Sequence, residues 1–152
     1  MIAVIVDNDK NKTLLCKEID DPIQPSDGYV LVDVAATAVN RADLLQRAGR
    51  YPPPLGAPET LGLEIAGRIS QIGEAVTGWS VGDRVCAIVT GGGYAERCWV
   101  HAGSLMMVPE PLSLLEAAAV PEAFLTAFVN LFEEAQLNPG ESVLIHGGAS
   151  GV

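Results

Sequence analysis

Glycines and prolines divide roughly the first hundred residues of the chain into short apolar runs, and this division limits what the chain can fold into more than any other feature. The runs are flanked by Gly, Pro, Asn and Asp, a pattern typical of strands joined by turns. We therefore expect strands over residues 2–6, 13–19, 29–34, 61–72, 84–89 and 94–100. Many short strands with such turns favour a small, partly open β-barrel.

The character of the sequence changes near residues 109–111, where helical patterns begin. Ser113, with Glu116 three residues later, predicts a capping box at the start of a helix. Pro121 predicts the first turn of a second helix, which we expect to run to about Leu137.

An apolar strand is expected over residues 141–146, followed by the glycine-rich turn 147–152. A glycine-rich turn after a buried strand normally leads into a helix whose N-terminus holds a phosphate. A single strand of the parallel type cannot bury both of its faces without neighbours. We therefore expect the chain to end just inside a second, truncated domain.

The acidic composition limits the kinds of partner. Lys and Arg number 9 against 19 Asp and Glu, which gives a formal net charge of −10. Nucleic acids and anionic membrane surfaces require clustered basic residues, so the composition argues against both. Hydrophobic residues make up 49% of the chain, which argues against disorder, and no apolar run is long enough to span a membrane.

The three cysteines, Cys16, Cys86 and Cys98, are odd in number and lack the CxxC spacing. We expect buried, reduced thiols, with a metal or disulfide role as the alternative. The first residues show no basic leader of the kind that begins a secretory signal. Together these features predict a cytoplasmic location.

Polar side chains gather on two connections of the expected β domain. Residues 40–54 combine a strand end, one or two helical turns and a proline-rich loop, and residues 61–67 follow as a glycine-punctuated strand. Asn, Asp, Tyr and Glu thus stand beside glycines, on connections of the kind that often carry active sites. The alternative is a surface connection without a function.

An ordered set of short motifs runs through nearly the whole chain, over residues 39–43, 47–52, 61–67, 81–85, 92–96, 117–121 and 148–152. In this order the motifs resemble the N-terminal half of the medium-chain dehydrogenase/reductase superfamily, and within it the zinc-free quinone oxidoreductase branch that includes zeta-crystallin. The resemblance implies a mainly β fold with helices. Residues 1–122 would form a GroES-like, partly open β-barrel, the catalytic domain. Residues 123–152 would be the first elements of a truncated Rossmann-type α/β domain, which binds NADP.

The same resemblance bears on zinc. Zinc-dependent relatives carry a cysteine where this chain has Asn40 and a histidine where it has Leu63. Zn²⁺ is bound by thiolate, imidazole or carboxylate, so an Asn amide is a poor substitute and a leucine offers no lone pair. Glu64 cannot hold the metal alone, and we expect it to be a structural hydrogen-bond acceptor. Residues 91–93 also lead directly to Tyr94, without the cysteine-rich lobe that holds structural zinc. We predict no zinc.

The resemblance further implies NADPH as the cofactor. Asn40 would hydrogen-bond the nicotinamide or its ribose, and Tyr51 would line the substrate opening and offer its phenol to a quinone oxygen. Thr126 would lie near the nicotinamide. The turn Gly148-Ala149-Ser150-Gly151-Val152 would pass under the pyrophosphate.

Structural roles remain the alternatives for these residues. Asn40 could be the N-cap of a helix over residues 41–47, alone or together with a cofactor contact. Tyr51 could be a packed loop aromatic, and Asp43 is expected to be structural. His146 is expected to pack or to form a hydrogen bond rather than to act as a base.

The resemblance implies a full-length enzyme that transfers hydride from NADPH to quinones or activated carbonyl compounds. This chain alone is expected to be inactive, because it supplies one wall of the cleft. The alternatives are an enoyl or enone reductase of the same superfamily and a non-catalytic binding module. The expected partners are a small quinone or enone and, for the full-length protein, a second copy in a homodimer. Residues 117–137 are expected to expose apolar surface through which this chain could self-associate.

Overall fold

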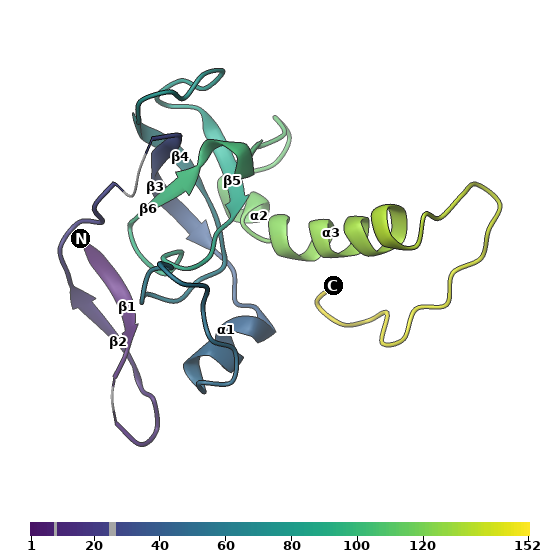
Figure 1. The fold of residues 1–152 in the computed structure, drawn as a ribbon, viewed down its shortest axis with the longest axis horizontal. Helices are drawn as coiled ribbons and strands as arrows, with labels where there is room; N and C mark the ends of the chain where they lie inside the picture. Colours follow the sequence, from purple (N-terminus) through teal and green to yellow (C-terminus); the bar gives the residue numbers. More distant parts are fainter. Residues whose placement is uncertain (8, 25–26) are drawn as a thin grey trace.

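Two antiparallel sheets form the body of the computed structural model, which describes residues 1–7, 9–24 and 27–152 (Figure 1). The small sheet pairs β1 (Ile2–Val6) with β2 (Leu14–Glu18). The large sheet has the strand order β6 (Arg97–His101), β3 (Tyr29–Thr37), β4 (Glu64–Ile72), β5 (Arg84–Ile88) and β7 (Leu105–Met107).

Neither sheet closes on itself. In the described part of the chain β6 and β7 are the edge strands of the large sheet, and they pair only with β3 and β5. A bridge between Ala3 and Ala95 joins the two sheets, supported by the Val4 N–H, which donates to the carbonyl of Tyr94 at 2.8 Å. This arrangement confirms the predicted mainly β, partly open domain.

The core lies on the strands at the centre of the large sheet. Val30 and Val32 on β3 pack with Ile65 and Ile69 on β4, and all four side chains are almost fully buried. A second apolar cluster lies between the sheet and α2 (Leu114–Ala117). There Ala66 on β4 and Cys86 on β5 pack with Val108, Ala117 and Ala118. Side chains of a strand alternate between its faces, so β4 can contribute to both clusters.

Helices lie at one end of this sheet and beside it. Helix α1 (Arg41–Arg47) connects β3 to the loop before β4, and a 3₁₀ turn, η1 (Ala102–Ser104), precedes β7. Helix α3 (Pro121–Phe128) continues into a π-helical segment, η2 (Val129–Glu134). Figure 1 shows α3 projecting away from the sheet, with the yellow C-terminal segment returning beneath it.

Two predictions near the C-terminus are wrong. The second helix begins at Pro121 as predicted, but it ends at Glu134 rather than near Leu137, and its last six residues are π-helical. Residues 141–146 do not form the predicted strand, and every residue from 141 to 152 is exposed. A strand needs a neighbour to satisfy its backbone groups and cover its apolar side chains, and no described strand pairs with this segment.

The cysteines divide into one exposed and two buried thiols. Cys86 and Cys98 are buried and free, as predicted, and burial raises the pKa of Cys98 to about 12. Cys16 is exposed, so its predicted burial is wrong. It lies on β2, in the two-stranded sheet, where most side chains of the strand are exposed.

Aromatic side chains are exposed along the helix that begins at Pro121, as the sequence predicted. Phe124 has 67% of its surface exposed, Phe128 50% and Phe132 49%. Self-association through this face stays a prediction. No helix in the described part of the chain has both the length and the apolar character required to cross a bilayer.

Candidate active site

The candidate site begins at the N-terminus of α1. Asn40 is the N-cap in an extended conformation, and its backbone N–H donates to Oδ2 of Asp43 at 2.7 Å, as part of a capping box. Asp43 is only 2% exposed. The predicted capping role of Asn40 and the structural role of Asp43 are therefore confirmed, whereas the role of Asn40 at a cofactor stays a prediction.

Glu64 lies across from Asn40, at the first position of β4, and is also only 2% exposed. Its Oε1 accepts a hydrogen bond from Nδ2 of Asn40 at 2.7 Å. Its Oε2 accepts one from the backbone N–H of Glu122 in α3 at 2.9 Å. The prediction that Glu64 is a hydrogen-bond acceptor is confirmed, and its two partners come from different helices.

Tyr94 completes this polar cluster from the segment between β5 and β6. Its hydroxyl donates to Oδ2 of Asp43 at 3.0 Å. Burial, followed by the negative charge of Asp43, raises the pKa of the Tyr94 phenol well above its ordinary value of 10, so the phenol stays protonated and remains a donor. Oδ1 of Asp43 is buried and has no hydrogen-bond partner among the described residues.

A close backbone approach places Tyr94 where its hydroxyl reaches Asp43. Gly62 has φ +101°, and a Cβ there would lie 2.5 Å from the backbone nitrogen of Tyr94. Only glycine leaves room for this contact and adopts this backbone conformation without strain. The Gly93 N–H donates to the carbonyl of Gly62 at 3.0 Å, which holds the two segments together.

The carboxylates give the cluster a negative electrostatic potential. Burial, followed by the charges of Glu64 and Asp43, raises the pKa of the Glu122 carboxyl above its ordinary value of 4.5. In the described part of the chain the ion pairs join Asp21 to the N-terminal amine and to Arg97, and Glu64 takes part in none. Neutral N–H donors and the N-terminal dipole of α3 therefore compensate the buried charge.

The donor set does not fit zinc. Asn40 turns an N–H donor toward Glu64, which is the reverse of what a metal ligand presents to a cation. Leu63, the neighbour of Glu64, is 8% exposed and carries no lone pair. Among residues 1–7, 9–24 and 27–152, no group of three or more His, Cys, Asp or Glu side chains could hold a metal ion.

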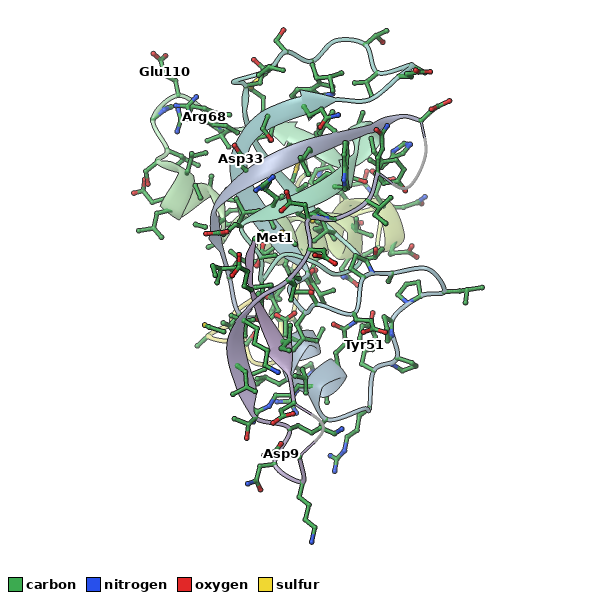
Figure 2. All side chains as sticks on the ribbon, turned by 90° about the vertical axis from the view of Figure 1, so that its left-hand side faces the viewer. Met1, Asp9, Asp33, Tyr51, Arg68 and Glu110 are labelled. Carbon is green, nitrogen blue, oxygen red and sulfur yellow. The ribbon has the colours of Figure 1, made fainter. Side chains whose placement is uncertain are left out.

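The other predicted site residues form no hydrogen bond with this cluster in the described part of the chain. Tyr51 is 49% exposed, on the connection between α1 and β4, and Figure 2 shows it below the large sheet. Thr126 is half-buried, one turn beyond Glu122 on α3. The predicted phosphate turn, Gly148-Ala149-Ser150-Gly151-Val152, is exposed throughout, and its Ser150 N–H donates to the carbonyl of Gly147.

A separate pocket of about 470 Å³ lies between the segment that follows β2 and strand β6. Its walls include Pro22, Ile23, Pro58 and Trp99. None of the predicted site residues lines it.

Sequence reasoning missed two members of the cluster. Tyr94 entered only as part of the motif over residues 92–96, and Glu122 was not singled out at all. Pro121 was the available signal for Glu122, because a proline at the first helical position leaves the next N–H as the first donor in need of a partner. Nothing in the spacing indicated that this partner would be Glu64.

The family comparison matches residues 26–110 to the model of the alcohol dehydrogenase GroES-like domain. This segment contains α1, β4 and the Asn40–Glu64 contact. The chain belongs to this family. The medium-chain dehydrogenase/reductase resemblance is thereby confirmed, and the GroES-like β domain is its fold.

Individual relatives agree with this assignment. The human synaptic vesicle membrane protein VAT-1 homolog-like is 38% identical over 129 residues, which cover 85% of this chain and 31% of the human protein. The crystal structure of CurK enoyl reductase matches with a TM-score of 0.86 and 30% identity, over 99% of this chain and 48% of that chain. The quinone oxidoreductase from Thermus thermophilus, whose complex with NADPH is also solved, matches with a TM-score of 0.74 and 35% identity, over 93% of this chain and 43% of that chain. This chain thus spans a third to a half of the length of these relatives.

Proposed function

We propose that this chain forms the substrate-side wall of an NADPH-dependent quinone oxidoreductase that works without zinc. The observation that carries the proposal is the Asn40–Glu64 hydrogen bond. It places a fixed amide where a zinc-dependent relative has a ligand, and it turns the acidic neighbour into an acceptor for that amide. The likeness to a quinone oxidoreductase solved with NADPH supports the choice of cofactor and substrate.

The residues present fit a nicotinamide dinucleotide in their chemistry. Asn40 is half-buried and its amide is oriented by Glu64, which suits hydrogen bonding to a carboxamide or a ribose. Thr126 offers a half-buried hydroxyl on α3. Residues 148–151 are small and exposed, which suits a turn around a phosphate, although the Ser150 N–H already donates to the carbonyl of Gly147.

When bound, NADPH supplies the hydride, so the protein has to bind, orient and shield the reactants. Asn40 would hold the nicotinamide end, and the walls around it would bring the quinone within reach. A quinone that takes up a hydride needs one proton to become a hydroquinone. Tyr51 Oη, half exposed on its loop, would donate that proton and be reprotonated by water.

Reduction of a carbon–carbon double bond conjugated to a carbonyl is the second candidate. The likeness to CurK enoyl reductase over 99% of this chain favours it. The hydride geometry is the same for both substrates, and the two reactions differ in the atom that receives the hydride. Tyr51 would then donate its proton to the carbon next to the carbonyl or to the carbonyl oxygen.

The test is NADPH oxidation by the full-length protein that contains this chain, with a panel of quinones and enones. We expect turnover of a naphthoquinone, a fall of about 10²-fold in kcat/KM for Asn40→Ala, and a lower kcat with unchanged NADPH affinity for Tyr51→Phe. Asn11→Ala is the matched control, because Asn11 is an exposed amide in the turn between β1 and β2. Turnover of enones alone would favour the enoyl reductase, and failure to bind NADPH would refute both candidates.

A further inference from the structure

The residues at the start of helix α3 provide no side chain that caps its first backbone N–H groups. The N-cap, Val120, has no side chain that can accept a hydrogen bond, and Pro121 has no N–H. The Phe124 N–H donates to the carbonyl of Val120, which leaves Glu122 and Ala123 with the first N–H groups that need partners.

Glu64 supplies the missing cap from a distant part of the sequence. Its Oε2 accepts the N–H of Glu122 at 2.9 Å, across 58 residues. A carboxylate at a helix N-terminus is favoured both as an acceptor and by the helix dipole. The start of α3 is therefore held by β4 and not by the residues that precede the helix.

The same carboxylate holds Asn40 through its other oxygen, at 2.7 Å. Each oxygen of Glu64 thus serves one donor, and the two donors belong to the helices that carry the proposed cofactor contacts. Thr126 lies one turn beyond Glu122, and Asn40 caps α1. The backbone of Glu64 is anchored as well, because its carbonyl accepts the hydroxyl of Thr37 at 2.6 Å and its position on β4 pairs with Ile88.

We infer that Glu64 is a positioning residue that couples the Asn40 amide to the start of α3, so that a displacement of the Asn40 amide alters the capping of α3, and a displacement of α3 alters the position of the Asn40 amide. A buried carboxylate that loses one of its donors cannot keep its position without cost, and no residue of the described ranges forms an ion pair with Glu64 that could compensate. A ligand that pulls on Asn40 would therefore shift α3 and Thr126. The inference rests on the proposed function for the identity of that ligand, whereas the coupling itself needs no ligand.

Amide hydrogen exchange at Glu122, measured by NMR on this chain at pH 8, tests the coupling. Asn40→Asp replaces the amide that donates to Glu64 by a second carboxylate. Asn40 forms no hydrogen bond with α3 in the described part of the chain, so any effect on α3 has to pass through Glu64. We expect exchange at Glu122 to become at least about tenfold faster, because the repelled Glu64 no longer caps the helix. Asn11→Asp adds the same charge in the exposed turn between β1 and β2 and should leave the exchange at Glu122 unchanged.

A complementary pair distinguishes coupling from damage to the fold. In Asn40→Asp combined with Glu64→Gln, the Gln amide can donate to the carboxylate introduced at position 40, and its oxygen can still accept the Glu122 N–H. We expect this pair to restore exchange at Glu122 to within about threefold of the original chain. Exchange that is unaffected by Asn40→Asp, or a double variant that is no better than the single one, would overturn the inference. NADPH titration of the full-length protein is the separate arm: loss of binding with intact coupling would refute the proposed function and leave the coupling in place.

Discussion

Replacing Gly62 by alanine tests how tightly the polar cluster is packed. The new Cβ would lie 2.5 Å from the backbone nitrogen of Tyr94 and 2.7 Å from the carbonyl carbon of Gly93. These are backbone atoms, so no side-chain rotation relieves the contact. A positive φ costs an alanine about 1–2 kcal/mol, and overpacking adds about 1–3 kcal/mol. The expected loss in free energy of unfolding is therefore about 2–5 kcal/mol, a large part of the roughly 5–15 kcal/mol available to a domain.

Gly78 provides the matched control, because it has φ +81° and nothing within 4 Å of an added Cβ. Gly78→Ala should therefore show only the backbone cost, about 1–2 kcal/mol. Urea unfolding followed by the fluorescence of Trp79 and Trp99 measures both variants. The reasoning is refuted if Gly62→Ala costs no more than Gly78→Ala.

Other predictions concern the thiols, a helix cap, the buried phenol and the activity of the chain alone. Cys16 should react with a disulfide reagent in the native protein, whereas Cys98, with its pKa of about 12 and its burial, should react only after unfolding; equal rates would contradict the structure. The hydroxyl and then the backbone N–H of Ser113 lower the pKa of Glu116 below its ordinary value of 4.5. The capping contribution should therefore be complete above about pH 4.5 and be lost as the pH falls through the lowered pKa, and Ser113→Ala should move the NMR titration midpoint of Glu116 up toward 4.5. Tyr94→Phe removes a donor to the buried carboxylate of α1 and should cost about 1–3 kcal/mol in urea unfolding; an unchanged midpoint would show that the hydrogen bond contributes nothing. The purified chain alone should show no NADPH-dependent turnover of naphthoquinone, and robust turnover would contradict the view that it supplies only one wall of the cleft.

Local patterns predicted most of the β domain. The runs between glycines and prolines correspond to β1 to β6, and the capping box at Ser113 and the helix start at Pro121 lie where expected. These features depend on neighbouring residues and therefore leave a signal in a short window. The three-residue strand β7 was missed, because so short a run has no period to recognise.

The failures involve contacts that no short window contains. The segment 141–146 has the composition of a buried strand, but composition cannot supply the neighbouring strand that would pair with it. Cys16 was expected inside because cysteine is usually buried, yet the two-stranded sheet leaves it exposed.

The candidate site shows the same division. Asn40 as a helix cap could be predicted from its own neighbours. Glu64 as an acceptor followed from the family resemblance, because Asn40 and Leu63 stand where zinc-dependent relatives have ligands. Their mutual contact spans 24 residues and the link from Glu64 to Glu122 spans 58, so only the folded sheet brings them together. The role of Tyr94 depends in the same way on the close approach at Gly62.

The central claim is that Asn40 and Glu64 shape a cleft for hydride transfer from NADPH in which no metal takes part. The most direct measurement is naphthoquinone reduction by the full-length protein after dialysis against a chelator, with the zinc content determined on the same sample. We expect undiminished turnover in protein that holds no stoichiometric zinc. Turnover that disappears with the chelator and returns when zinc is added would contradict the account.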